Sequence, residues 1–475
     1  MRRSLAFIAP FALYAASAYH VVTYWDVGEM DTVPYILGIA HPSGFPLYTL
    51  IGWAFTHLLA FGSVAWRMSM LSALAMAGAA WLVSRIVAEL GEDEWAALAA
   101  ALLFAAGGVV WAHATRAEVH AFVALAFAAL AYFLLRWYRS GAARDFYATM
   151  AVLGLGVAIH PVVALGLLGI IAAVVVRADE ADPRVLLRGG ALACACGAVW
   201  FAYLPLRSAW VDTHHLDPAA AYGVGSGAFW NYDDPSTAAG FAALVSGRDV
   251  GVGFDRFGWT NDAFSEGVAL FVRVASTEFT VPGLALGLFG VALLFRRRAA
   301  LGTIACATLL PSAIFGCGFG AESDVDRYFL PAFILLAAGA GVACARARRL
   351  RLPLLAAVAV MIAVLIVTQR GFFDQPGDDR ALVEADEILH ATPPDAIVVA
   401  TWVMAPPLAY DDYVRHVTAD RVILPAWYGD TEDRLADWMR ARPVFVAGTP
   451  EGSVPGFHLE RMPTKTVLYR VVRDP

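Results

Sequence analysis

The chain has 475 residues, of which 59% are hydrophobic and only 16% are charged, and its mean hydropathy is +0.62. A soluble domain has about half of its residues apolar and about a quarter charged. The apolar excess stands in repeated long blocks, as membrane-spanning helices require. This composition excludes a soluble metabolic enzyme and a nucleic-acid-binding protein. The five cysteines lie in apolar blocks, which excludes a disulfide-rich secreted scaffold.

The net charge of −7 belongs to the C-terminal part of the chain. Residues 371–475 carry 17 acidic and 10 basic side chains, whereas residues 1–370 carry 24 of each. An acidic segment is repelled by the phosphates of nucleic acids and by anionic lipid headgroups. We therefore expect no nucleic-acid partner.

Eleven apolar segments predict eleven membrane-spanning helices. The first segment begins at Arg2 and Arg3 and continues to about Trp25. Residues 16–18, Ala-Ser-Ala, resemble a signal-peptidase site, so cleavage there is an alternative. The other spans are expected over residues 66–88, 95–113, 119–137, 146–160, 161–177, 189–206, 279–295, 299–319, 328–345 and 353–369.

Arginines indicate how these spans are oriented. Under the eleven-span count they gather at five turns on one side of the membrane, and such turns face the cytoplasm. The N-terminus then lies inside and residue 371 outside. Abundant arginine and alanine suggest a GC-rich bacterial genome, so we expect a multi-pass protein of the bacterial inner (plasma) membrane, in contact with its lipids. The arginines are Arg85, Arg136, Arg139, Arg144, Arg177, Arg184, Arg188, Arg296, Arg297, Arg298, Arg346, Arg348, Arg349 and Arg351.

Three outer segments are too long to be simple connections. Two of them, 26–65 and 207–278, are loops of a transmembrane domain over residues 1–370. The third is the tail, 371–475, which alternates helical and strand-like patterns and predicts a small α/β domain outside the cytoplasm. Its helices are expected over 379–390, 407–416 and 431–440, and its strands over 396–400, 421–424, 443–447 and 466–472.

The densest polar cluster follows the first span and contains Asp26, Glu29 and Asp31. Carboxylates at a membrane surface are costly unless they serve a function. A carboxylate partly removed from water has a raised pKa and can act as a general base towards a hydroxyl group. The alternative is a solvated loop that merely ends the span.

A second motif, residues 40–48, contains two prolines and a glycine that restrict the backbone. Such a rigid loop can hold a ligand, and His41, Pro42 and Tyr48 are its candidate contacts. The alternative is a turn before an amphipathic helix, 47–61, that lies in the membrane interface.

Further candidates stand where spans meet the outer surface. Arg116, Glu118 and His120 form either an ion-paired helix end or part of a polar site, and His160 is either a turn residue or a ligand contact. Arg207 and Arg327 present the planar donor fork that suits a phosphate, unless they extend to lipid headgroups. The sequence contains no spacing typical of zinc ligands and no Walker-type loop.

At these residues the chain resembles a bacterial membrane family of unknown function, which also includes a vertebrate O-mannosyltransferase of receptor ectodomains. That family carries a D-x-G-E motif followed by HPPGYPLY, and this chain departs from its pattern at Ser43, Phe45 and His120. The matching segments are 26–29, 38–48, 118–120, 160, 203–207, 230–235 and 326–331.

The resemblance implies a GT-C-like fold: an all-α polytopic membrane protein with about eleven transmembrane helices. It also implies an inverting glycosyltransferase that takes a sugar, such as mannose, from a polyprenyl-phosphate carrier, with a protein or glycan hydroxyl as acceptor. Asp26 is then the base and Glu29 its neighbour, and no metal or other cofactor is expected. The remaining residues assigned to substrate binding are Trp230, Asp234, Asp326 and Tyr328.

Two other functions stay open. A flippase or exporter of lipid-linked glycans would carry polar residues in the middle of its spans. An inactive relative would use its tail to bind a cell-wall polymer.

Overall fold

The computed structural model describes residues 2–223, 228–247, 262–320, 324–347, 349–426 and 428–475. The chain folds into two compact units, each made from three separate segments. The first, here the helical unit, contains Met1–Ala18, Ser69–Trp200 and Val250–Gln375. The second, here the mixed unit, contains Tyr19–Met68, Phe201–Asp249 and Pro376–Pro475. The expected domain boundary after residue 370 lies near the start of the last segment, but the mixed unit also takes in much of the two outer loops.

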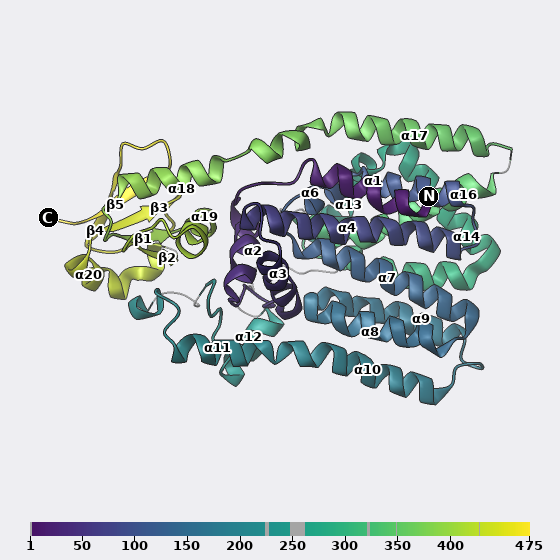
Figure 1. Ribbon diagram of the computed structural model, residues 1–475, viewed down its shortest axis with the longest axis horizontal. Coiled ribbons are helices and arrows are strands. Elements are labelled where there is room, and N and C mark those ends of the chain that lie inside the picture. The colour runs from purple at the N-terminus through teal and green to yellow at the C-terminus, as the bar shows by residue number, and fades with distance from the viewer. Residues whose placement is uncertain (1, 224–227, 248–261, 321–323, 348, 427) are drawn as a thin grey trace. The chain divides into compact units, whose positions relative to one another are not determined.

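The helical unit is built almost wholly from helices (Figure 1). Its first half contains α1 (Arg2–Ala15), most of α4 (Val64–Glu89), α5 (Glu94–Ala105), α6 (Gly108–Ala114), α7 (Val119–Ser140), α8 (Ala143–Ile159), η1 (Pro161–Gly166), α9 (Leu167–Val176) and most of α10 (Pro183–Phe201). Its second half contains α13 (Asp262–Glu278), α14 (Thr280–Leu309), α15 (Pro311–Cys317), η4 (Val325–Phe329), α16 (Leu330–Arg346), α17 (Arg351–Thr368) and most of η5 (Arg370–Gly377).

Small residues bring the central helices of this unit together. A Cβ atom on Gly290 of α14 would lie 1.7 Å from the carbonyl oxygen of Gly339 on α16, so the two backbones touch. Such contact between small residues is a principal source of helix association in lipid. Helices α10 and α17 lie at opposite edges of the unit and expose large apolar side chains, among them Leu187 and Leu352, as lipid-facing helices do (Figure 1).

Fewer helices than expected have full spanning length. The described residues contain five helices long and apolar enough to cross a membrane, or up to seven if each of two bent pairs counts as one span. The predicted count of eleven is not reached by this measure. The first helix ends at Ala15 instead of near Trp25, and α8 and the segment Pro161–Val176 are short. The turn expected between 279–295 and 299–319 is present, because the backbone leaves helical geometry at Arg298.

In the mixed unit, the tail folds around a five-stranded sheet of order β2-β1-β3-β5-β4 (Figure 1). The strands are β1 (Ile397–Ala400), β2 (Val422–Pro425), β3 (Val444–Ala447), β4 (Phe457–Arg461) and β5 (Leu468–Arg473). Strand β1 pairs in parallel with β2 and β3, whereas β5 is antiparallel to β3 and β4. The four expected strands are therefore confirmed, and β4 was missed because its alternate residues are exposed instead of forming an apolar run.

The helices of the mixed unit come from all three of its segments. They are α2 (Trp25–Ile36), α3 (Pro46–Leu58), α11 (Tyr203–Thr213), η2 (Ala220–Tyr222), α12 (Ala238–Ser246), α18 (Arg380–Ala391), α19 (Ala405–Tyr410), η6 (Asp411–Arg415), η7 (Tyr428–Thr431) and α20 (Glu432–Ala441). The expected tail helices 379–390 and 431–440 correspond to α18 and α20. The one expected over 407–416 begins earlier, at Ala405, and widens into a π turn after Tyr410.

Candidate active site

The acid cluster lies on a helix and not in a solvated loop, which corrects one of the two interpretations of the sequence. Helix α2 begins at Trp25 and continues until Leu37, whose backbone is left-handed with φ of 55°. Asp26 and Glu29 are three residues apart and therefore share one face of α2. The Glu29 side chain is 0% exposed, whereas that of Asp26 is 40% exposed. Only Asp26 of this pair is accessible to a substrate.

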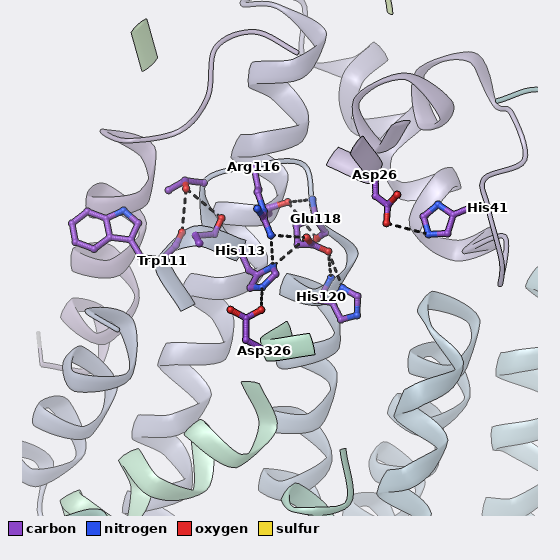
Figure 2. Close-up of polar contacts among 11 residues, drawn as sticks. Asp26, His41, Trp111, His113, Arg116, Glu118, His120 and Asp326 are labelled. Atoms are coloured by element: carbon purple, nitrogen blue, oxygen red, sulfur yellow. Dashed lines mark hydrogen bonds and ion pairs between the residues drawn. The ribbon is translucent and has the colours of Figure 1, made fainter. Parts of the chain in front are cut away.

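His41 joins these two carboxylates. Its backbone N–H donates to Glu29 Oε1 at 2.9 Å, and its ring Nδ1 forms a short contact with Glu29 Oε2. Its other ring nitrogen, Nε2, lies 3.8 Å from Asp26 Oδ2 (Figure 2). Both oxygens of Glu29 are thus used to hold His41. The arrangement makes Glu29 a residue that positions the imidazole between two carboxylates.

The loop that carries His41 is fixed by its own backbone. Gly44 has φ of 78° and its N–H donates to the carbonyl of His41 at 2.8 Å. The ring of Phe45 stands edge-on to the His41 ring, with 5.1 Å between centroids. Tyr48 is wholly buried in α3, and its predicted contact with a ligand stays a prediction. Pro42 lies next to His41 in this turn, where it restricts the backbone.

Arg207 stabilises the end of α2. Its Nε donates to the carbonyl of Leu37 at 2.6 Å and its Nη2 to that of Ile36 at 3.1 Å. The hydroxyl of Tyr203 donates to Leu37 as well, at 2.7 Å. These donors satisfy carbonyl groups that a helix end leaves without partners. The Arg207 guanidinium, which we expected to bind a phosphate, therefore donates at least two of its hydrogen bonds to the end of α2.

The second outer segment adds Trp230 and Asp234 to the mixed unit. Trp230 lies 5.9 Å from the Arg207 guanidinium, at a distance typical of a cation–π contact. Asp234 Oδ1 accepts hydrogen bonds from Ser208 at 2.9 Å and Ser236 at 2.5 Å, so this carboxylate joins α11 to the loop before α12. Trp230 therefore lies near the end of α2, and the predicted contacts of Trp230 and Asp234 with a substrate stay predictions.

Trp402 contacts Asp26 and was missed from the sequence. Its indole Nε1 donates to Asp26 Oδ1 at 2.8 Å. Trp402 is the second residue after β1, at the carboxyl edge of the parallel strands, where α/β sheets bind their ligands. The position of Trp402 after a predicted strand was the feature of the sequence that could have marked it as a site residue. Nothing in the local sequence links residue 402 to residue 26.

A second polar group lies in the helical unit and is called here the histidine cluster: His113, Arg116, Glu118, His120 and Asp326. Glu118 is buried at its centre, with Oε2 3.1 Å from His113 Nδ1 and Oε1 2.8 Å from His120 Nδ1 (Figure 2). Arg116 approaches the same carboxylate at 3.6 Å, and Asp326 lies 3.8 Å from His113 Nε2. The sequence identified all of these residues except His113, which sits in the apolar segment expected to form a span.

The remaining candidates flank this cluster. The ring of Tyr328 stands edge-on to that of His120, with centroids 5.6 Å apart, and the His160 ring lies 5.0 Å from His120. His160 Nδ1 also accepts from the N–H of Val162 at 3.1 Å, so it caps η1. The guanidinium of Arg327 lies over Tyr328, 5.7 Å from the ring centre. The turn-residue interpretation of His160 is thus compatible with a place beside the cluster.

Asp26, Glu29 and His41 also have the chemistry of a metal site. One ligand atom from each lies within 4.8 Å of the others. Two carboxylates and an imidazole suit several divalent ions. In this structure, however, Glu29 uses both oxygens on His41, and Trp402 donates to Asp26. These contacts join Glu29 to His41 and Asp26 to Trp402, and the expectation that no metal is needed stays a prediction.

The sequence is similar to protein O-mannosyltransferases. Residues 26–183 match the family model of the Protein O-mannosyl-transferase TMEM260 N-terminal domain. The chain is 31% identical over 136 residues to Protein O-mannosyl-transferase tmem260 of Dictyostelium discoideum, covering 28% of this chain and 16% of that protein. It is 30% identical over 223 residues to the TMEM260 enzyme of Mus musculus, covering 46% and 29%. The chain thus aligns with less than a third of either relative, and the predicted resemblance to this family is confirmed.

The fold is similar to that of ArnT from Cupriavidus metallidurans, solved bound to undecaprenyl phosphate and in the apo state. The TM-score is 0.63 for both structures, and the alignments cover 98% of this chain and 96% and 97% of those chains. Sequence identity is only 12% and 14%, so this likeness shows the fold alone. Together with the apolar helices it supports the expected multi-pass membrane protein with a GT-C-like fold.

Proposed function

We propose that this chain is an inverting glycosyltransferase that moves a hexose, in the first instance mannose, from a polyprenyl-phosphate carrier to a hydroxyl group of a protein or glycan. The names of its relatives and the lipid phosphate bound to ArnT support the reaction class. Within this chain, the observation that carries the proposal is the exposed Asp26 carboxylate, held beside the buried pair of Glu29 and His41.

In the proposed reaction, Asp26 takes the proton from the acceptor hydroxyl. The acceptor oxygen forms a bond to the anomeric carbon of the sugar as the bond from that carbon to the carrier phosphate breaks. A single displacement of this kind inverts the anomeric configuration. The phosphate leaves as an anion and needs no proton from the enzyme.

Glu29 and His41 help to return Asp26 to its ionised form for this step. Glu29 fixes the ring of His41, and Nε2 of that ring faces Asp26 at 3.8 Å. After transfer, the proton on Asp26 has a neighbouring imidazole as its acceptor, which allows Asp26 to ionise again before the next turnover. A carboxylate general base accelerates such a step by typically 10²–10⁴-fold.

The leaving phosphate requires positive partners. The resemblance of the sequence assigns this role to Arg207 and Arg327, and both assignments stay predictions. Within the histidine cluster, Arg116 and Asp326 are held in place through Glu118 and His113. The proposed orientation puts the N-terminus in the cytoplasm and the acid pair on the opposite side, where lipid-linked sugars are the available donors.

The decisive experiment incubates the purified protein in detergent with radiolabelled polyprenyl-phosphate mannose and other hexoses, with and without hydroxyl acceptors. Transfer or slow hydrolysis of the donor is expected for the wild type. Asp26→Asn should lower this activity at least 100-fold and leave the elution volume and melting temperature unchanged. Glu451→Gln, which alters an exposed carboxylate of the tail, is the matched control and should retain full activity. Full activity in Asp26→Asn would overturn the mechanism.

The alternative is a transporter that moves the lipid-linked sugar without cleaving it. In proteoliposomes it would carry the intact labelled donor across the bilayer and release no sugar. That outcome, together with no hydrolysis in detergent, would replace the enzyme proposal.

A further inference from the structure

The tail contacts α2, the helix that carries Asp26 and Glu29, through a hydrogen bond and through the packing of α19 and η6. Trp402 donates its indole N–H to Asp26 Oδ1 at 2.8 Å, and both residues belong to the mixed unit. A hydrogen bond to an ionised group is shorter and stronger than one between neutral groups. This bond joins residues that are 376 positions apart in the chain.

The position of Trp402 is determined by groups on both of its sides. Its ring stacks on Phe229 with 5.6 Å between centroids and 20° between planes. Just before it, Thr401 is buried so closely against Gly448 that a Cβ atom there would lie 2.0 Å from the Thr401 hydroxyl. Because residues on both sides hold it, the indole has little freedom to turn away from Asp26.

Helix α2, which carries Asp26 and Glu29, is held against the same part of the tail. A Cβ atom on Gly28 would lie 2.8 Å from Cβ of Pro406 in α19, and 2.3 Å from the carbonyl oxygen of Thr23. The glycine of the D-x-G-E motif therefore allows α2 and α19 to approach closely. This contact keeps Asp26 of α2 close to Trp402, which lies just before α19.

The topology of the sheet also indicates a functional edge. The chain leaves β1 for β2 on one side and then returns to β3 on the other side of β1. Ligands of open α/β sheets bind at the carboxyl ends of the strands, where the strand order reverses. In this chain the segment at that place carries Trp402, which is bonded to Asp26.

We propose that Trp402 is a positioning residue for the reaction and that the tail thereby completes the catalytic centre. The inference rests on the proposed function, in which Asp26 is the base. Trp402 holds Oδ1, so that the carboxylate keeps one orientation and presents Oδ2 to the acceptor hydroxyl. An acceptor that reaches Asp26 passes beside Trp402, whose partly exposed indole offers a flat surface on which a sugar or a peptide can stack.

The test uses Trp402→Phe in the full-length protein, which keeps an aromatic ring against Phe229 and removes the N–H donor. We expect kcat for hydrolysis of polyprenyl-phosphate mannose to fall about 10- to 100-fold, as for loss of one hydrogen bond to a charged group, with the KM for this donor within about twofold. Replacement of Trp402 by 3-benzothienylalanine, which has sulfur in place of N–H in the same bicyclic shape, should give the same loss. Trp210→Phe, at an exposed tryptophan of α11, is the control and should have no effect.

The outcomes separate this inference from the proposed function. If Asp26→Asn is inactive but both changes at Trp402 leave kcat intact, the inference is wrong and the function stands. If they raise the donor KM and lower the melting temperature with kcat unchanged, Trp402 is only a packing residue and the inference is again wrong. If Asp26→Asn is fully active, the proposed function fails first.

Discussion

The carboxylate of Glu278 accepts a hydrogen bond from the backbone N–H of Val109 at 2.7 Å. Its other oxygen accepts from the N–H of Val110 at 3.1 Å. Glu278 ends α13 at a bend of 106°, and Val109 is the second residue of α6, which follows a bend of 72°. One buried side chain therefore joins the breaks of two bent helix pairs and satisfies amide groups that have no partner within α6.

Glu278→Ala should destabilise the protein. The change leaves the buried N–H of Val110 and the partly buried N–H of Val109 without acceptors, and a buried N–H without an acceptor costs roughly 1–3 kcal/mol. We expect a lower melting temperature in detergent, with a smaller drop for Glu278→Gln, which keeps one acceptor oxygen. An unchanged melting temperature in Glu278→Ala would mean that the contact with α6 contributes nothing to stability.

Gly28→Ala should lower activity more than stability. The added Cβ has 2.3 Å to the Thr23 carbonyl and 2.8 Å to Pro406, so α2 must move away from α19 and carry Asp26 with it. A displacement of about 1 Å at a catalytic group can lower the rate 100-fold. Donor hydrolysis and thermal unfolding of the same preparation would measure both effects. The control is Gly190→Ala on α10, where a Cβ meets no atom within 4 Å and activity should be unchanged.

Asp31→Asn should make the stability less dependent on pH. Asp31 is 2% exposed, and burial raises its pKa well above the usual value, although a hydrogen bond from the Thr23 backbone opposes this change. The folded protein keeps the proton that the unfolded chain releases above about pH 4. The contribution of Asp31 to the free energy of unfolding is therefore fully present below that pH. It falls by roughly 1.4 kcal/mol per pH unit as the pH rises, until the raised pKa is reached.

Thermal unfolding between pH 4 and 8 would test this. The wild type should lose stability with rising pH through this group, whereas Asp31→Asn should lose less and be the more stable protein at pH 8. Parallel curves for the two proteins would show that Asp31 does not contribute.

Chelation should leave the activity unchanged. Asp26, Glu29 and His41 are close enough to hold an ion, but Glu29 and His41 already bond to each other. We therefore expect donor hydrolysis within about twofold of normal after treatment with EDTA, as for a reaction that needs no Lewis acid. Loss of activity that added Mn²⁺ or Mg²⁺ restores would contradict this expectation and assign the three residues to a metal site.

Much of the local structure could be predicted from the sequence. Hydropathy indicated the long helices, and the alternation of patterns in the tail predicted four strands, because both depend on residues close together in the chain. The same holds for Asp26 and Glu29, whose spacing and motif singled them out. Two predictions about local structure were wrong. The first helix ends at Ala15 instead of near Trp25, and the carboxylates lie in helix α2 instead of a loop.

Only the tertiary structure decided which of these groups can act. It buried Glu29 against His41 and left Asp26 exposed, it directed Arg207 to the end of α2, and it brought Trp402 to Asp26. These outcomes depend on contacts between residues 12, 170 and 376 positions apart, and burial and hydrogen-bond geometry are properties of such contacts. Composition and spacing were therefore enough to predict a membrane protein and to single out Asp26 and Glu29. Contacts between segments that are distant in the sequence determined which role each of these residues can have.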